Sequence, residues 1–147
     1  MAEKIIYTMD YESLKDLFIK SGLEIHEEDP APEGLVTCFK LIDEETGERL
    51  GAAGLVLNHK NEYILRCVAV EEKHRGKGYG IQLVNKVLEE AKMRGTERIW
   101  LTGKVPEFYK KFGFTVAKRS DAPFKTKCGE CPQYHNGCES EVMVFYY

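Results

Sequence analysis

Apolar residues recur along this 147-residue chain at two spacings, and each spacing predicts a different kind of element. Apolar positions three and four residues apart predict an amphipathic helix, whereas a short apolar run between turn residues predicts a strand. Helical spacing occurs in residues 10–22 and again after Gly80, where the predicted apolar face holds Ile81, Leu83, Val84, Val87, Leu88 and Ala91. Strands are predicted at 4–8, 34–43, 48–58, 62–70, 97–101, 113–119 and 141–147, with a short third helix at 105–112.

Turn and cap residues separate these elements. Asp10 is suited to cap the first helix, and Gly22 and Gly95 are suited to end the first and second helices. Gly47, in EETGE, predicts a tight turn that joins two neighbouring strands as a hairpin. The predicted order is strand, helix, three strands, helix, strand, helix and two strands. This order and the chain length indicate one α/β (α+β) domain spanning residues 1–147.

The composition narrows the classes of partner. The net charge is only −3, and no basic stripe with interleaved aromatic residues is present, so nucleic-acid binding is not supported. Neither a long apolar run nor a signal-peptide pattern is found, which predicts a cytoplasmic protein that does not enter a membrane. Two of the five cysteines, Cys38 and Cys67, lie in strand-like segments, unlike a secreted disulfide framework. A small-molecule partner is therefore expected.

Residues 74–80, HRGKGYG, combine three glycines with cationic side chains immediately before the second predicted helix. Glycine at this density favours positive φ angles and a close approach of a ligand to the backbone. Unpaired amides and the helix dipole at a helix N-terminus favour an anion. Neither the P-loop motif nor the dinucleotide fingerprint matches the run from Arg75 to Gly80. The alternative is a glycine-rich turn without a ligand.

Two stretches of the sequence resemble signatures of one large enzyme superfamily. The stretch CVAVEEKHRGKGYGIQLVNKVLEEA resembles the pyrophosphate-binding motif of the GNAT superfamily of acetyl-CoA-dependent N-acetyltransferases, and PEFYKKFGF resembles its second signature. The resemblance implies a mixed, mostly antiparallel sheet of six to seven strands. It also implies that helices cover both faces and that the sheet splays apart at the acetyl-CoA cleft.

The resemblance assigns coenzyme contacts to two segments. It implies that backbone amides of the loop hold the pyrophosphate of acetyl-CoA, through Arg75, Gly76, Lys77, Gly78, Tyr79 and Gly80. It further implies that the preceding strand pairs with the pantetheine arm, through Val68, Ala69 and Val70. Arg75 and Lys77 are expected at an exposed rim, where they would act as screened charges.

Acyl transfer to an amine requires a neutral nucleophile and a stabilised leaving group. A primary amine with a pKa near 10.4 is mostly protonated at neutral pH, and deprotonation alone costs roughly 4.6 kcal/mol. An N–H of the strand at Val68 or its neighbour is a candidate donor to the oxyanion. By resemblance, Tyr109 is the general acid that donates to the departing sulfur. The alternative is a tyrosine that only packs in the short helix.

The general base is less well defined by the sequence. The position where related enzymes often carry a carboxylate is Ile64 in this chain, which departs from the family pattern. Glu62, two residues earlier and on the same strand face, is a candidate base acting through a water, and His59 is a second candidate. The alternative for Glu62 is a solvated charge at the end of a strand.

The acceptor is expected to be a primary amine of a small molecule or a peptide. An acidic loop falls where related enzymes build their acceptor wall, and it would attract a cationic amine; its acidic residues are Glu24, Glu27, Glu28, Asp29 and Glu33. The alternative is an ordinary solvated surface. The alternative function for the whole chain is a non-catalytic module on the same fold that binds coenzyme A or is regulated by a metal or by redox state. A homodimer is the expected assembly by default.

The segment from 128 to 138, CGECPQYHNGC, is explained by neither motif. Cys128, Cys131, His135 and Cys138 are four soft ligands within eleven residues, a set that suits tetrahedral Zn²⁺. Free thiols or a redox-labile pair of Cys128 and Cys131 are the alternatives in a reducing compartment. The segment connects the last two strands and is expected to line the acceptor end of the cleft.

Metal analysis of protein purified without chelator separates these readings. A structural site predicts about one equivalent of metal and protected thiols, because the ligands bind as thiolates. Free thiols predict metal far below one equivalent and three titratable thiols from the segment. The second result would eliminate the metal site.

Overall fold

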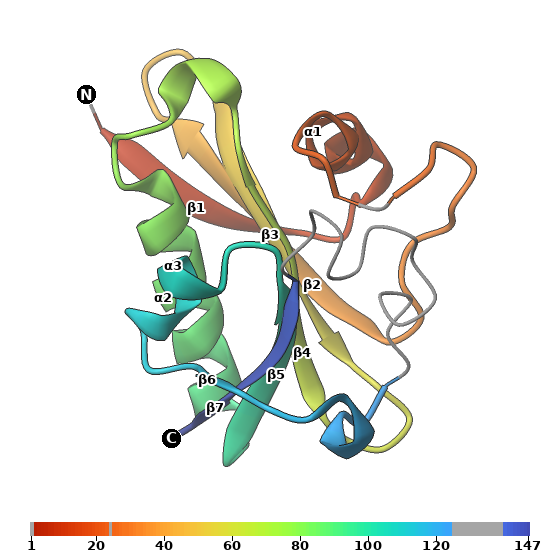
Figure 1. The fold of residues 1–147 in the computed structure, drawn as a ribbon. Helices are drawn as coiled ribbons and strands as arrows, with labels where there is room; N and C mark the ends of the chain where they lie inside the picture. The colour runs from red at the N-terminus through yellow and green to blue at the C-terminus, as the bar shows by residue number, and fades with distance from the viewer. Residues whose placement is uncertain (1, 24, 125–139) are drawn as a thin grey trace.

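The computed structural model describes residues 2–23, 25–124 and 140–147 (Figure 1). Within them a seven-stranded sheet has the order β1-β2-β3-β4-β5-β7-β6. The strands are β1 (Glu3–Thr8), β2 (Leu35–Asp43), β3 (Arg49–Leu57), β4 (Tyr63–Val70), β5 (Arg98–Gly103), β6 (Thr115–Val116) and β7 (Glu141–Tyr146). The predicted element order is confirmed, as is the mixed and mostly antiparallel sheet. The four candidate Zn²⁺ ligands, Cys128, Cys131, His135 and Cys138, lie outside the described residues.

The sheet opens between β4 and β5. All other neighbouring strands pair antiparallel, but β4 and β5 pair in parallel, and only at Tyr63 with Ile99 and at Ile64 with Trp100. Both strands continue beyond this short ladder, β4 to Val70 and β5 to Gly103. The predicted splay is therefore confirmed, and it begins immediately after Ile64.

Helices cover both faces of the sheet, as Figure 1 shows. On one face, α2 (Tyr79–Met93) and α3 (Pro106–Lys110) pack on a core that includes Phe39, Leu55 and Leu83. On the other face, the 3₁₀ turn η1 (Glu12–Leu14) and α1 (Lys15–Lys20) bury a second core that includes Phe18 and Cys38. Two further 3₁₀ turns, η2 (Glu72–His74) and η3 (Arg119–Asp121), lie in connections. No helix in the described part of the chain is long and apolar enough to cross a bilayer.

The apolar spacing of the sequence predicts the buried side chains correctly along most of α2. In α2 the positions at Leu83, Val84 and Val87 are fully buried, as the helical spacing predicts. Ile81 belongs to the same predicted face but is 47% exposed, because it lies two residues from both Tyr79 and Leu83, which face the core, and so points away from them around the helix. At the N-terminal helix, the Asp10 carboxylate accepts the amide N–H of Ser13 at 3.2 Å, which confirms its capping role.

The predicted strand at 113–119 is mostly irregular. Only Thr115 and Val116 pair with β7, and both side chains are exposed. Gly113 has a φ of 104°, and η3 begins at Arg119, so both ends of the run leave the extended conformation. This edge strand of the sheet is consequently short.

Arg49 ties α1 to the sheet near the end of β4. Its guanidinium donates to both carboxylate oxygens of Asp16 in α1, at 3.0 and 2.9 Å, and to Glu71 at 2.8 Å. These contacts lower the pKa of Asp16, chiefly through the Arg49 hydrogen bond. Glu71 directly follows β4, so the ion pairs fix the start of the connection to α2.

Two glycine-to-alanine variants test the packing between the sheet and α2. A Cβ at Gly51 of β3 would lie 2.8 Å from the Ala69 carbonyl oxygen and 3.0 Å from Leu83 Cδ1, so Gly51→Ala should destabilise the fold by about 1–3 kcal/mol. A Cβ at Gly80 meets Phe108 at 3.4 Å, an ordinary contact, so Gly80→Ala should not destabilise. Urea denaturation measures both free energies of unfolding. Equal stabilities of the two variants would contradict the packing described.

Candidate active site

The glycine-rich loop between β4 and α2 presents unpaired backbone amides. Gly76 and Gly78 have φ angles of 83° and 81°, and nothing described lies within 4 Å of a Cβ built on either residue. Gly78 is the N-cap of α2 and has no side-chain cap, so the first-turn amides of the helix are also without intrahelical partners. In the described part of the chain, the amides from Gly76 to Gly78 donate no hydrogen bond. The loop is thus an open cradle of N–H groups suited to an anion.

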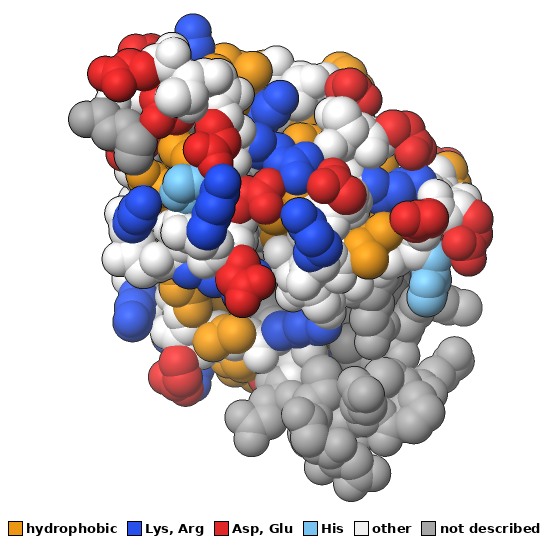
Figure 2. Space-filling view, turned by 90° about the horizontal axis from the view of Figure 1, so that it is seen from above, with side chains coloured by type: hydrophobic (Ala, Val, Ile, Leu, Met, Phe, Trp, Pro, Cys, Tyr) orange, Lys and Arg blue, Asp and Glu red, His pale blue; other side chains and the backbone are white. Residues whose placement is uncertain are grey.

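The cationic side chains of the loop interact with the protein rather than pointing into this cradle. Arg75 Nε donates to the Val70 carbonyl at 3.3 Å, and Lys77 Nζ lies 3.3 Å from His74 Nδ1. Both Arg75 and Lys77 are exposed, at the rim as expected. Figure 2 shows acidic and basic side chains intermixed over the described part of this face.

Tyr79 and Gly80 serve the loop in ways that the sequence does not predict. The Tyr79 side chain is 4% exposed and belongs to the core, so only its backbone is offered to a ligand. Gly80 lies inside α2 without a positive φ, and a Cβ built on it would make only an ordinary contact with Phe108 of α3 at 3.4 Å. The requirement for positive φ therefore applies to Gly78 and not to Gly80.

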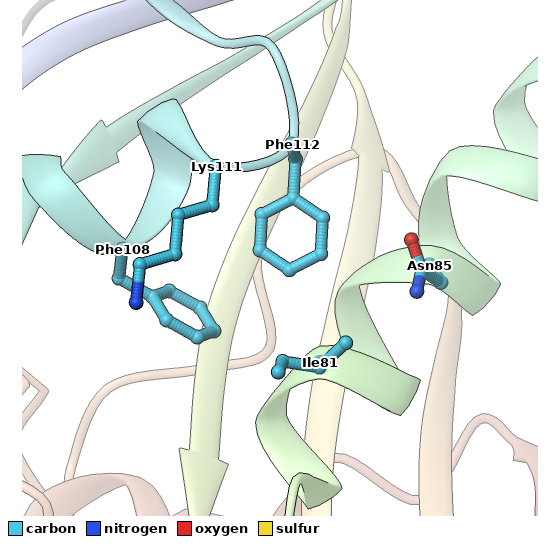
Figure 3. Close-up of a pocket in the computed structure, with 5 residues that line it drawn as sticks. All are labelled: Ile81, Asn85, Phe108, Lys111 and Phe112. Atoms are coloured by element: carbon cyan, nitrogen blue, oxygen red, sulfur yellow. The ribbon is translucent and has the colours of Figure 1, made fainter.

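A cavity of about 450 Å³ lies beside the loop between α2 and α3. Figure 3 shows its lining: Ile81 and Asn85 from α2, and Phe108, Lys111 and Phe112 from α3 and the turn after it. Apolar and aromatic surfaces with an amide and one ammonium suit a planar, polar-edged ligand. Sequence reasoning missed this cavity, because the helical spacing assigned Ile81 to the face of α2 that packs on the core.

A β-bulge interrupts β4 where the sheet is open. Ala52 pairs with Ala69 and Gly54 with Arg66, so Cys67 and Val68 together oppose the single residue Ala53. Cys67 has a φ of 65°, in the left-handed region that non-glycine residues rarely occupy. The bulge turns the backbone of β4 at this point and breaks its regular ladder with β3. The sequence carries no glycine to signal it.

The three residues predicted to pair with an extended ligand all lie at or beyond this bulge. Val68 and Val70 pack on the α2 core, and Ala69 is 5% exposed in the α1 core. Their side chains are thus engaged within the protein. Only the backbone edge of β4 that faces β5 is left for a ligand, because the ladder between these strands ends at Ile64.

Tyr109 reaches the open end of the sheet from α3. A Cβ at Gly103, the last residue of β5, would lie 2.9 Å from Tyr109 Cδ2, so the glycine allows the ring to lie against the strand. Burial raises the pKa of Tyr109 to about 12, and the proximity of Cys67 adds to this shift. The hydroxyl is therefore protonated at neutral pH, and Tyr109 and Val68 of the bulge pack against the same hydrophobic core. The structure thus brings Tyr109 and the β4 bulge together.

Glu62 is held away from the bulge. Its carboxylate accepts Arg98 Nε at 2.6 Å and is also ion-paired with the terminal nitrogen of the same guanidinium. The pair lies at the closed end of the gap, one residue before Tyr63 and Ile99 begin the parallel ladder. Five residues separate Glu62 from Cys67, or about 16 Å along an extended strand. Glu62 is thus an ion-paired side chain, and its role as a base stays a prediction.

The remaining candidates lie in two loops. His59 is exposed in the turn between β3 and β4. In the loop after α1, Glu27, Glu28 and Glu33 are exposed, and the Asp29 carboxylate accepts the amide of His26 at 2.8 Å. No group of three or more possible metal ligands occurs among the described residues.

Lys104 links the two sides of the gap. Its ammonium, just after β5, donates to the carbonyl oxygen of Gly22 at the end of α1. The C-terminal end of α1 is therefore beside the open end of β5.

Comparisons with known proteins agree with this architecture. Over 65 residues the chain is 37% identical to the uncharacterized N-acetyltransferase YobR of Bacillus subtilis (strain 168), a match that covers 44% of this chain and 25% of YobR. The fold is similar to N-acetylglutamate synthase from Neisseria gonorrhoeae, complexed with coenzyme A and N-acetyl-glutamate, with a TM-score of 0.74 and 19% identity over 99% of this chain and 35% of the synthase. It is also similar to the ribosomal-protein-S18-alanine N-acetyltransferase from Escherichia coli, with a TM-score of 0.73 and 19% identity over 99% of this chain and 94% of that enzyme.

These structural likenesses concern the fold, and the chain spans only about a third of the synthase and matches a quarter of YobR. The sequence itself matches the acetyltransferase (GNAT) family over residues 6–114, which include the glycine loop, the bulge and Tyr109. Because this match extends over most of its length, the protein belongs to the acetyltransferase (GNAT) family.

Proposed function

We propose that the protein transfers the acetyl group of acetyl-CoA to a primary amine by direct attack within a ternary complex. The observation that carries this proposal is the junction of three features in one gap of the sheet. They are the open amide cradle at Gly76 and Gly78, the unpaired edge of β4 with its bulge at Cys67, and the protonated Tyr109 hydroxyl.

Coenzyme binding follows from the shape of this gap. The amides from Gly76 to Gly80 would hold the pyrophosphate, because a helix N-terminus with glycine in the left-handed region admits phosphate oxygens to the backbone. The Arg75 amide, also predicted for this role, donates instead to the Glu72 carbonyl at 3.3 Å. The edge of β4 from Val68 to Val70 would pair with the amide groups of the pantetheine arm. The cavity between α2 and α3 lies beside the cradle and is available to the adenine end of the coenzyme.

The chemistry requires balanced proton movements. The amine nitrogen bonds to the acetyl carbon, the C–S bond breaks, the departing thiolate takes up a proton and the amine loses one. An N–H at Cys67 or Val68 would donate to the oxyanion, because the bulge turns this part of the backbone out of the regular ladder. Tyr109 would donate to the sulfur. With a pKa of about 12 it remains a donor, so hydrogen bonding in step with cleavage is favoured over complete proton transfer.

The candidates for the general base are Glu62 and His59. The third option is a desolvated amine that reacts without a protein base. Related structures point to different acceptors, since one neighbour carries N-acetyl-glutamate and another is named for an alanine of ribosomal protein S18. The alternative function, a coenzyme A-binding module without catalysis, is favoured by Ile64 at the position of the family carboxylate and by the ion pair of Glu62 with Arg98. Cys128, Cys131, His135 and Cys138 stay candidates for a structural Zn²⁺ site.

A steady-state assay of thiol release from acetyl-CoA, run against a panel of amines, tests the proposed function. Amine-dependent thiol release is expected. Tight coenzyme binding without amine-dependent release would favour the non-catalytic module.

Two matched valine variants test the amide cradle. Gly78→Val should raise the dissociation constant for acetyl-CoA at least about tenfold, because a β-branched side chain opposes positive φ and fills the anion site. Gly95→Val is the control, since Gly95 has a φ of 86° and open space around its Cβ position but follows the other end of α2. Titration calorimetry measures both affinities. Equal losses of acetyl-CoA affinity in the two valine variants would reject the pyrophosphate assignment. Arg75→Ala and Lys77→Ala should each lower acetyl-CoA affinity less than Gly78→Val does.

Two matched phenylalanine variants test the acid. Tyr109→Phe should lower kcat about a hundredfold and leave acetyl-CoA affinity unchanged, because the hydroxyl acts on the departing sulfur. Tyr147→Phe is the control: burial also raises the pKa of Tyr147 to about 12, but its hydroxyl donates to the Leu88 carbonyl at 2.6 Å. An unchanged kcat in Tyr109→Phe would remove this residue from the mechanism.

The raised pKa of Tyr109 also predicts the pH profile of the wild-type enzyme. A shift from 10.0 to about 12 keeps the proton on the phenol through pH 10, where an ordinary tyrosine is half ionised. Consequently kcat/KM should not fall between about pH 8 and pH 10. A falling limb near pH 10 that disappears in Tyr109→Phe would show that its pKa is not raised.

A further inference from the structure

Arg66 carries a guanidinium next to the bulge, on the side of the sheet that α1 covers. It lies on β4 immediately before Cys67, and its side chain is exposed. Antiparallel partners share a face of a sheet, so Cys38 of β2, Gly54 of β3 and Arg66 form a row across the α1 side of the sheet. The side chain of Arg66 interacts with the Cys67 thiol, whose pKa is raised by burial and lowered in part by this neighbour. Arg66 is therefore adjacent to the proposed site of acetyl transfer.

Arg66 differs from the other arginines in the part of the chain that the structure describes. Each of the others donates to an oxygen acceptor: Arg49 to Asp16 and Glu71, Arg75 to the Val70 carbonyl, Arg94 to Glu90, Arg98 to Glu62, and Arg119 to the Ser140 carbonyl. No described carboxylate or carbonyl accepts a hydrogen bond from Arg66. A guanidinium offers five N–H donors in a planar fork that matches a carboxylate.

The residue beside Arg66 on the neighbouring strand β3 has no side chain. Gly54 is the strand partner of Arg66, and its missing side chain leaves a notch in the row. Apart from the Arg66 carbonyl oxygen at 3.2 Å, no described atom lies within 4 Å of a Cβ built on Gly54. No described side chain therefore stands between Gly54 and Arg66 in this row.

Other donors lie on the same side of the sheet. Tyr11 is 3% exposed, burial raises its pKa to about 12, and its hydroxyl is close enough to Arg66 and Cys67 to sense their charges. Trp100 pairs with Ile64, which shares this face of β4 with Arg66, and the buried Trp100 indole N–H has no acceptor among the described residues. Two donors on this side, the Arg66 guanidinium and the Trp100 indole N–H, therefore remain for oxygen atoms of a ligand, alongside the Asp29 carboxylate that acts on Tyr11.

We propose that the acceptor carries a carboxylate close to its amine and that Arg66 binds this carboxylate, so that the substrate class is a free amino acid. This proposal rests on the proposed acetyl transfer. Bidentate pairing of the guanidinium and carboxylate would fix the orientation of the acceptor, with the amine directed from Arg66 toward the adjacent bulge. The N-terminal amine of a protein lacks such a carboxylate, because the neighbouring carboxyl group forms a peptide bond.

Paired substrates provide the first test. Thiol release from acetyl-CoA is measured with each proteinogenic amino acid and with its carboxamide, which keeps the amine and removes the anion. Glycine is compared further with β-alanine, in which the two groups are more distant, and with a peptide that has an N-terminal alanine. At least one free acid is expected to exceed its carboxamide at least about tenfold in kcat/KM. Equal rates for acids and carboxamides would overturn the carboxylate proposal and leave acetyl transfer intact.

Variants of Arg66 provide the second test. Arg66→Gln should raise KM for the free acid about tenfold or more, leave KM for acetyl-CoA unchanged, and remove the preference for the acid over its carboxamide. Arg66→Lys should restore part of this preference, which a purely structural role would not predict. Arg94→Gln, the same change at an arginine paired with Glu90, is the control and should keep the preference. An unchanged preference in Arg66→Gln would contradict the proposal. If no amine stimulates thiol release from acetyl-CoA, both proposals are overturned together.

Discussion

The site depends on one constraint, the short parallel ladder between β4 and β5. Pairing is limited to two residue pairs, and beyond Ile64 the facing edge of β4 has no strand partner within the described residues. An unpaired backbone group that is shielded from water costs about 1–3 kcal/mol, so this edge must bind water or an extended ligand. The seven-stranded sheet thus contains a gap that a chain of amide groups can fill, and the bulge at Cys67 lies inside that gap.

The elements around the gap fix the ends of a bound molecule. At one end, α2 begins at Gly78 with unpaired amides, and Arg49 holds the preceding connection through Glu71. At the other end, Gly103 lets the Tyr109 ring lie against β5, where burial keeps the phenol protonated. The row from Cys38 through Gly54 to Arg66 lies on the α1 side of the sheet, where the proposed acceptor would bind. The coenzyme and the acceptor would therefore approach from different sides, with the pyrophosphate held at the cradle and the thioester meeting the amine at the bulge.

Regular burial made most of the fold predictable from sequence. The apolar spacing in α2 and the glycine run before it located the loop, and Tyr109 followed from a resemblance in PEFYKKFGF. Features that depend on tertiary contacts were not predictable. Cys67 adopts a left-handed backbone without being glycine, and Gly80 is a glycine without a positive φ. The ion pair of Glu62 with Arg98 joins residues 36 apart in sequence, so no local pattern could separate this carboxylate from a catalytic base.

Amide hydrogen exchange, with and without coenzyme A, tests the central claim most directly. Coenzyme A that fills the gap should protect two separate segments, the β4 edge from Leu65 to Val70 and the loop from Gly76 to Ile81. The opposite edge strand β1 should exchange at the same rate in both states, because it lies three strands away from β4 in the sheet. Protection of the loop together with unchanged exchange along β4 would contradict the account, since the ligand would then bind the anion cradle without entering the sheet.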